Sequence, residues 1–212
     1  MFVCKIISKV KRGMSWPFSR KIQYLENSYC RLKVLTIYRY MFRYIGRNCL
    51  IRKPLFITPE FISIGDGVII WDNARIEAIH NYGVQSFTPS IIIGNGVSIQ
   101  QRCHITAASN LIIGENTLIS FDVMIQDTDH EYQTLDIPIG DQPLSVKTTA
   151  IGSNCFIGCG AKIQAGTILG NHCIVGANSV VRGFFPDNVV IAGVPAKIIK
   201  KYDLISNTWI RC

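Results

Sequence analysis

A repeat of six residues constrains the fold of this chain more than any other feature of its sequence. An aliphatic residue recurs at every sixth position, often with glycine next to it and a small residue four places on. The clearest runs begin at Ile64, Ile93, Ile113 and Ile151, and the repeat reaches back to about Ile45. Six residues suffice for one short strand and one turn. Three repeats therefore predict one coil of a parallel β-solenoid, with successive coils about 4.8 Å apart.

Each position of the repeat has an expected place in the solenoid. The aliphatic residue fills the interior, the i+4 residue is small because it points inward close to a corner, and Gly or Asn at i+1 to i+3 supplies the turn. Four of the eight cysteines stand at i+4, namely Cys49, Cys103, Cys155 and Cys173. We expect packed core thiols and a reducing compartment, because the cysteines spread over the whole chain without a CxxC pair.

The composition indicates one globular domain with an uneven charge. The 212 residues are 48% hydrophobic and 17% charged, which disfavours disorder and a coiled coil. Residues 1–53 hold 13 basic residues and one acid, whereas residues 54–212 hold nine basic and 13 acidic residues. The net charge of +8 therefore belongs to the N-terminal segment. We read no signal peptide and no transmembrane helix, since no apolar run is long enough, and we expect a cytoplasmic protein.

Two segments interrupt the repeat, residues 79–90 and residues 127–150. Insertions in a solenoid leave it at corners, where function is expected. Each contains a histidine, His80 in the shorter segment and His130 near the start of the longer one. The other two, His104 and His172, stand in regular coils, where we expect solvated turn residues.

The repeat and the block that follows it resemble the hexapeptide-repeat acyltransferases. The block runs Ile-Ala-Gly-Val-Pro-Ala-Lys-Ile-Ile from Ile191 to Ile199 and is similar to the C-terminal element of sugar and xenobiotic O-acetyltransferases. The resemblance implies a left-handed parallel β-helix, with the handedness taken from it alone. It also implies acetyl-CoA as co-substrate, no metal, and a homotrimer with sites between neighbouring prisms. It divides the chain into a basic helical segment (1–44), a β-helix acetyltransferase domain (45–199) and a C-terminal tail (200–212).

The resemblance assigns the catalytic base to His130. The family's catalytic histidine stands where a loop leaves the end of a coil, and the hexads from Ile119 to His130 match that register without a gap. A histidine suits the role because its side chain exchanges protons near neutral pH. We expect direct transfer without an acyl-enzyme. The group that orients His130 stays open, a backbone carbonyl or a carboxylate from the set Asp122, Asp127, Asp129 and Glu131.

Further site residues follow from register with the family. The expected acetyl-CoA contacts are Cys159, Ala177, Arg182, Gly183, Lys197 and Lys200, with the basic residues facing phosphate. The expected acceptor contacts are Gln100 and Asp127. The chain differs from the family at Gly183, which replaces a cation, at Phe156, which replaces a tryptophan, and at Ala108, which replaces an acid. Cys159 also offers an alternative as a covalent nucleophile.

The expected reaction is O-acetylation of a sugar or polysaccharide precursor. Alternatives are N-acetylation of an amino sugar nucleotide and acetylation of serine or a xenobiotic. A zinc carbonic anhydrase of this fold is disfavoured, because no second histidine lies within twenty residues of His130. Residues 1–44 predict one or two helices, either a peripheral anchor on anionic lipid at the inner face of the membrane or a cap over the open end of the solenoid. We expect no nucleic-acid partner, since no recognised module accompanies the charge.

Overall fold

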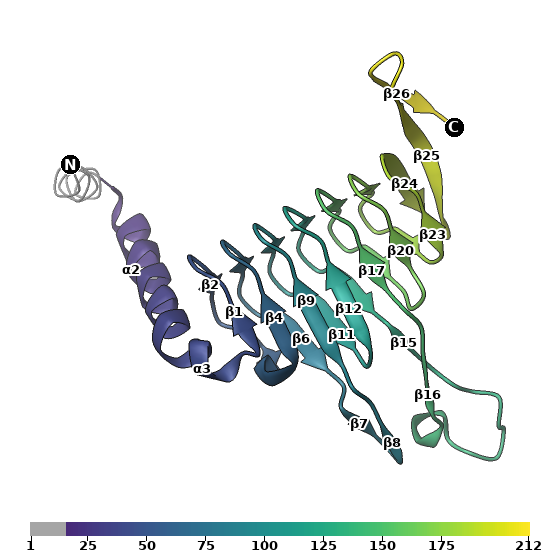
Figure 1. Ribbon diagram of the computed structural model, residues 1–212, viewed down its shortest axis with the longest axis horizontal. Coiled ribbons are helices and arrows are strands. Elements are labelled where there is room, and N and C mark those ends of the chain that lie inside the picture. The colour runs from purple at the N-terminus through teal and green to yellow at the C-terminus, as the bar shows by residue number, and fades with distance from the viewer. Residues whose placement is uncertain (1–15) are drawn as a thin grey trace.

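The structure is a computed structural model that describes residues 16–212. It is a left-handed parallel β-helix with a helical segment at its N-terminal end and a β-hairpin at its C-terminal end (Figure 1). Two further hairpins project from one side of the prism. The fold class predicted from the repeat and the family resemblance is confirmed.

Three sheets form the faces of the prism. The first sheet contains β1 (Tyr44–Ile45), β4 (Ile62–Ile64), β9 (Ser90–Ile93), β12 (Asn110–Ile113), β17 (Ala150–Ile151), β20 (Ile168–Leu169) and β23 (Phe184–Phe185). The second contains β2 (Leu50–Ile51), β5 (Ile69–Ile70), β10 (Ser98–Ile99), β13 (Leu118–Ile119), β18 (Phe156–Ile157), β21 (Ile174–Val175) and β24 (Val189–Gly193). The third contains β3 (Phe56–Ile57), β6 (Arg75–Ala78), β11 (His104–Ala107), β14 (Met124–Gln126), β19 (Lys162–Ile163) and β22 (Val180–Val181). A short 3-10 helix, η2 (Pro59–Phe61), links β3 to β4.

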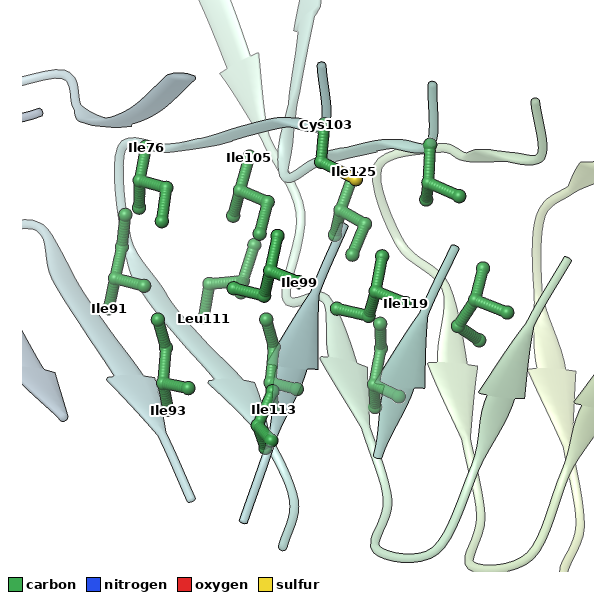
Figure 2. Packing of buried hydrophobic residues seen from close by; sticks show 14 of the residues in the cluster. Ile76, Ile91, Ile93, Ile99, Cys103, Ile105, Leu111, Ile113, Ile119 and Ile125 are labelled. Atoms are coloured by element: carbon green, nitrogen blue, oxygen red, sulfur yellow. The ribbon is translucent and has the colours of Figure 1, made fainter. Parts of the chain in front are cut away.

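The aliphatic positions form columns inside the prism. Most strands carry one outward residue and then one inward residue, so each hexad sends a single branched side chain to the interior. Ile157 pairs with Val175 as predicted, and Ile105 pairs with Ile125. Figure 2 shows Ile105 and Ile125 pointing into the interior of the prism, together with Ile99 and Ile119 from the second sheet. All are essentially inaccessible to solvent, so the core is a continuous aliphatic stack.

The four cysteines at i+4 are buried, as predicted. Each thiol lies near a backbone carbonyl of the next coil. The Sγ–O distances are 3.1 Å from Cys49 to Gly65, 2.9 Å from Cys103 to Ser120, 3.2 Å from Cys155 to Gly170 and 3.2 Å from Cys173 to Pro186. Burial raises the pKa of the Cys103 thiol to about 11. A protonated thiol is therefore a weak donor that fits the corner, not a nucleophile.

The corners turn through residues in the left-handed region of the backbone. Positive φ values recur at i+3 of the hexads, at Asn48, Asn73, Asn116, Asn154 and Asn178 among others. Asn adopts this conformation more readily than most residues because its short amide can bond to the local backbone. The Asn residues of the repeat are therefore corner residues.

A helical segment covers the first coil. It consists of α2 (Phe18–Lys33), a π-helical turn η1 (Val34–Tyr38) and α3 (Arg39–Met41). Cys30, Val34 and Phe42 are buried against the β-helix. The predicted helices are thus present, and of the two roles considered for them the structure shows the contacts of a cap. The predicted basic segment also includes residues 1–15, which lie outside the described residues.

A buried arginine joins α2 to the prism. The Arg52 guanidinium donates to Asn27 at 2.8 Å and lies 3.1 Å from Glu26 and 2.9 Å from Asp72. It also stacks over the Trp71 ring, 5.5 Å from its centroid. Because these partners come from both α2 and the coil that carries β5, Arg52 fixes the helix in place.

The second sheet continues beyond the last coil. β25 (Ala196–Asp203) runs antiparallel to β24, and β26 (Thr208–Arg211) runs antiparallel to β25. The segment predicted as a tail therefore forms this hairpin, and β25 crosses the predicted boundary at residue 199. Within residues 16–212, no helix combines the length and apolar character that crossing a membrane requires.

Both interruptions of the repeat leave the prism at the corner between the third and first sheets. The shorter one forms the hairpin of β7 (Asn81–Tyr82) and β8 (Gln85–Ser86). The longer one begins and ends in the antiparallel pair β15 (Thr128–His130) and β16 (Leu144–Val146), with the 3-10 helix η3 (Ile139–Asp141) between them. The two hairpins project side by side (Figure 1) and are joined by hydrogen bonds.

Candidate active site

The two hairpins meet around His130. In the β15–β16 ladder, His130 stands opposite Leu144. The backbone of Leu144 is held by the Gln85 side chain of the other hairpin, which accepts from its N–H at 2.6 Å and donates to its carbonyl at 3.2 Å. The side-chain amide thus acts like one more strand residue. It attaches the shorter insertion to the strand pair that carries His130.

Tyr82 holds the imidazole of His130. Its hydroxyl donates to the Gly140 carbonyl at 2.5 Å and lies 3.3 Å from His130 Nδ1. A hydroxyl has one proton and a carbonyl can only accept, so the contact with the ring requires a proton on Nδ1. That tautomer leaves the lone pair on Nε2. The rings also meet edge to face, with centroids 5.5 Å apart.

The orienting group is therefore a phenol and not one of the four carboxylates considered from the sequence. Asp122 lies at the other corner of the third sheet, where two hydrogen bonds of 2.7 Å from Arg102 lower the pKa of its carboxyl. Asp129 lies 2.6 Å from Arg182 and 3.7 Å from Lys147. The contact geometry of His130 thus differs from the expectation.

Asp127 is placed differently from the prediction. Its carboxylate is completely buried and accepts hydrogen bonds from Ala108 N, Ser109 N and Ser109 Oγ, at 2.7 to 2.8 Å. All of these donors belong to the preceding coil. The carboxylate therefore fixes the start of the longer insertion, residues 127–150, to the prism and does not face an acceptor. Since Ala108 is itself buried, its side chain is also not available to a ligand.

A pocket of about 330 Å³ lies beside His130. It is lined by Asp129, His130, Glu131, Tyr132, Gln133, Ser145, Lys147 and Arg182. Arg182 comes from the corner after β22, and its ion pair with Asp129 draws the excursion toward that coil. The pocket therefore combines an imidazole with two cations and two carboxylates, and both cations are paired with Asp129.

Only Arg182 of the predicted acetyl-CoA contacts lies beside His130. Cys159 and Ala177 stand on successive coils at the opposite corner of the third sheet, where Asn178 N donates to Cys159 O at 2.8 Å. Lys197 and Lys200 lie on β25, opposite Ala192 and Val190.

The remaining predicted contacts have individual explanations. Gln100 lies at the same corner as Cys159, after β10, and donates to Ser98 Oγ at 3.1 Å. Gly183 has a φ of +110°, a conformation that favours glycine over a basic side chain. Phe156 is partly exposed on the outer face of the second sheet.

The other histidines lie outside the pocket. His172 occupies an exposed turn with a φ of +55° and stacks on Trp209, with centroids 6.1 Å apart. His104 is exposed as predicted, but the predicted turn was wrong, because the residue begins β11 and points outward from a strand. His80 stacks on Phe61, with centroids 5.4 Å apart.

Sequence reasoning missed Tyr82, Gln85 and Lys147. A signal for the first two existed in the repeat. The interruptions follow Ile76 and Ile125, and both isoleucines belong to the third face of the prism, so counting hexads places both insertions at one corner. The sequence held no such signal for Lys147, since it comes close to Asp129 only because β16 runs back alongside β15.

Comparisons with known proteins agree with this architecture. Residues 148–183 match the family model described as bacterial transferase hexapeptide (six repeats). The chain is 36% identical over 176 residues to the putative lipopolysaccharide biosynthesis O-acetyl transferase WbbJ of Escherichia coli K12. This alignment covers 79% of this chain and 86% of WbbJ.

Solved structures show the same fold at lower identity. A maltose O-acetyltransferase from Clostridium difficile 630 superposes with a TM-score of 0.58 at 22% identity, over 86% of this chain and 89% of that chain. A galactoside acetyltransferase in complex with coenzyme A superposes with a TM-score of 0.54 at 20% identity, over 89% of this chain and 85% of that chain. Given its identity to WbbJ over most of both sequences, the chain belongs to the bacterial hexapeptide-repeat transferases and is an acetyltransferase.

Proposed function

We propose that this enzyme transfers an acetyl group from acetyl-CoA to a hydroxyl of a sugar or polysaccharide precursor. The observation that carries the proposal is His130, held through Nδ1 by Tyr82 and placed at a pocket with two cations. The similarity to WbbJ supports a glycan acceptor, and the coenzyme A complex of the galactoside acetyltransferase supports the donor.

In the proposed mechanism His130 acts first as a base and then as an acid. Nε2 removes the proton of the acceptor hydroxyl while its oxygen attacks the thioester carbonyl. A backbone N–H from a neighbouring coil stabilises the oxyanion. The tetrahedral intermediate then expels the thiolate, which takes the proton from Nε2, so the products are the acetyl ester and coenzyme A. Tyr82 accepts from Nδ1–H throughout and stabilises the imidazolium.

We further propose a homotrimer in which two copies build each site. His130 and Arg182 stand at one corner of the third sheet, whereas Cys159, Ala177 and Gln100 stand at the other. Residues at opposite corners of one face can approach one ligand if a second prism packs alongside. Arg182 and Lys147 then face phosphates from one copy, and Cys159, Ala177, Lys197 and Lys200 contact the donor from the next.

The outer face of the first sheet offers a contact surface for such packing. Its outward residues lie in register from coil to coil and are largely apolar, namely Ile92, Ile112, Ala150, Ile168 and Phe184. Phe184 is 73% exposed and Ile92 and Ile112 are each 39% exposed. A closed threefold assembly would cover a ladder of this kind. We place the enzyme in the cytoplasm, where the core thiols at i+4 stay reduced.

The test is acetyl transfer by His130→Ala. The purified variant is incubated with acetyl-CoA and a panel of sugars, nucleotide sugars and glycans, and release of the coenzyme A thiol is followed. We expect the transfer to be lost while the subunit count is retained. The matched control is His172→Asn, which keeps a residue suited to the left-handed turn and should retain activity. Near-normal turnover of His130→Ala would overturn the base assignment, and exclusive use of amine acceptors would overturn O-transfer.

A further inference from the structure

The N-terminal helix packs one face on the prism and leaves an apolar face exposed on its other side. Cys30 on the inner face of α2 is buried against the first coil, and Val34 and Phe42 beyond the helix are buried there as well. On the outer side, five large side chains are exposed at alternating spacings of four and three residues, namely Phe18, Ile22, Leu25, Tyr29 and Leu32. This spacing places them in one stripe along the helix. We call these five residues the outer stripe.

Positive charge lies along the helical segment and is not neutralised by a carboxylate of the described residues, although Arg31 donates to Asn48 O and Arg43 to Ser90 Oγ on the prism. The cations of residues 16–43 are Arg20, Lys21, Arg31, Lys33, Arg39 and Arg43. Within the described residues, none of them forms an ion pair. The single acid of this segment, Glu26, lies 3.1 Å from Arg52 and 3.7 Å from Lys53 and so faces the prism. By sequence, residues 1–15 add four cations and no acid.

A second basic feature adjoins the helical segment. A pocket of about 780 Å³ between this segment and the first coil is lined by Arg39, Arg43 and Arg47 together with apolar residues that include Leu35 and Phe42. Arg47 is paired with Asp66 at 3.3 Å, whereas Arg39 and Arg43 have no carboxylate partner among residues 16–212. Arg43 donates to Ser90 Oγ at 3.4 Å. The combination of an apolar wall with two guanidinium groups that lack a carboxylate partner fits a phosphate headgroup next to its acyl chains.

We propose that the outer stripe and its cations bind the surface of an anionic phospholipid bilayer. The helix would lie in the plane of the interface, with the stripe in the acyl boundary and the cations at the phosphates. With 16 residues, α2 is about 24 Å long, which suits lying on a bilayer and not crossing it. The charge disfavours a second copy of this helix as the occupant, since two such faces would repel each other.

The test measures binding of the full-length protein to vesicles by co-sedimentation. The vesicles contain phosphatidylcholine alone or phosphatidylcholine with phosphatidylglycerol. We expect binding only to the anionic vesicles, weakened by high salt because screening shortens the reach of the charges. Lys21→Glu with Arg39→Glu should weaken binding by at least about 25-fold, since each surface cation contributes about fivefold. Leu25→Glu with Leu32→Glu should abolish it.

The matched control alters an equally exposed apolar pair elsewhere. Leu204 and Ile205 at the tip of the C-terminal hairpin are 76% and 93% exposed, so Leu204→Glu with Ile205→Glu should bind as the parent does. The inference is overturned if all variants bind alike, if neutral vesicles bind equally well, or if the Leu25 and Leu32 variant changes the subunit count by light scattering. Circular dichroism verifies that each variant is folded.

Discussion

Tyr82→Phe tests whether the phenol that bridges the two insertions contributes to catalysis. The substitution removes the hydroxyl that lies 3.3 Å from His130 Nδ1 and keeps the ring that packs on the imidazole. A neutral hydrogen bond contributes about 0.5–1.5 kcal/mol and one to a charged group about 1.5–3 kcal/mol. In the proposed mechanism His130 starts the reaction as a neutral base and is cationic in the transition state. The hydroxyl therefore favours the transition state by about 1–2 kcal/mol, and its loss should lower kcat about 5–30-fold.

Steady-state release of the coenzyme A thiol measures this effect. The KM for acetyl-CoA should change little, because Tyr82 is not among the residues that line the pocket beside His130. A second readout is the nitrogen NMR spectrum of His130, which should report a proton on Nδ1 in the parent and a mixture of tautomers in the variant. Tyr40→Phe serves as the control, since Tyr40 is 85% exposed on α3. An unchanged kcat together with an unchanged tautomer would refute the reasoning.

Three further predictions follow from the fold and the site. Ile105→Ala should lower the free energy of unfolding by about 2–5 kcal/mol in a denaturant titration, because its side chain fills the core. The control is His104→Ala, one residue away on the outer face, which should lower it by less than about 1 kcal/mol. Equal effects would contradict the inward and outward register. Arg52→Ala should loosen α2, seen as faster trypsin cleavage within the helix with the prism still folded, and unchanged cleavage would show that apolar contacts alone hold it. Cys159→Ala should retain acetyl transfer with a reduced affinity for acetyl-CoA. Complete loss of transfer in the variant, together with an acetylated Cys159 detected in the parent by mass spectrometry, would favour the covalent alternative.

The repeat made the prism predictable because its contacts are local and periodic. A hexad places its aliphatic residue inward wherever it occurs, so the burial of Ile157, Val175 and Cys173 could be read from spacing alone. The same regularity located the insertions, and the resemblance to known acyltransferases then pointed to His130. Handedness was beyond this reasoning, since short strands and turns of either hand have the same spacing, and it came from the resemblance to known acyltransferases.

Predictions for individual surface residues were less successful. Asp127 was predicted to contact the acceptor, yet its carboxylate is buried in the corner and accepts three hydrogen bonds from the preceding coil. His104 was expected in a turn, but it stands one residue after the corner and so points outward from β11. In both cases, side chains only one or two positions apart in the hexad lie in different places, namely the interior, the corner or the outer face.

By itself the sequence determined the solenoid, the length of its coils, the inward position of four cysteines and the corner from which the long excursion departs. Only the tertiary structure decided which side chains complete the site. Tyr82 and His130 are 48 residues apart on insertions without a repeat, and their contact depends on how two irregular hairpins pack together. Arg52 likewise meets Glu26 only because α2 folds back over the first coil. Periodic segments have their neighbours set by their own spacing, whereas non-periodic segments find theirs through packing and hydrogen bonds that no local pattern encodes.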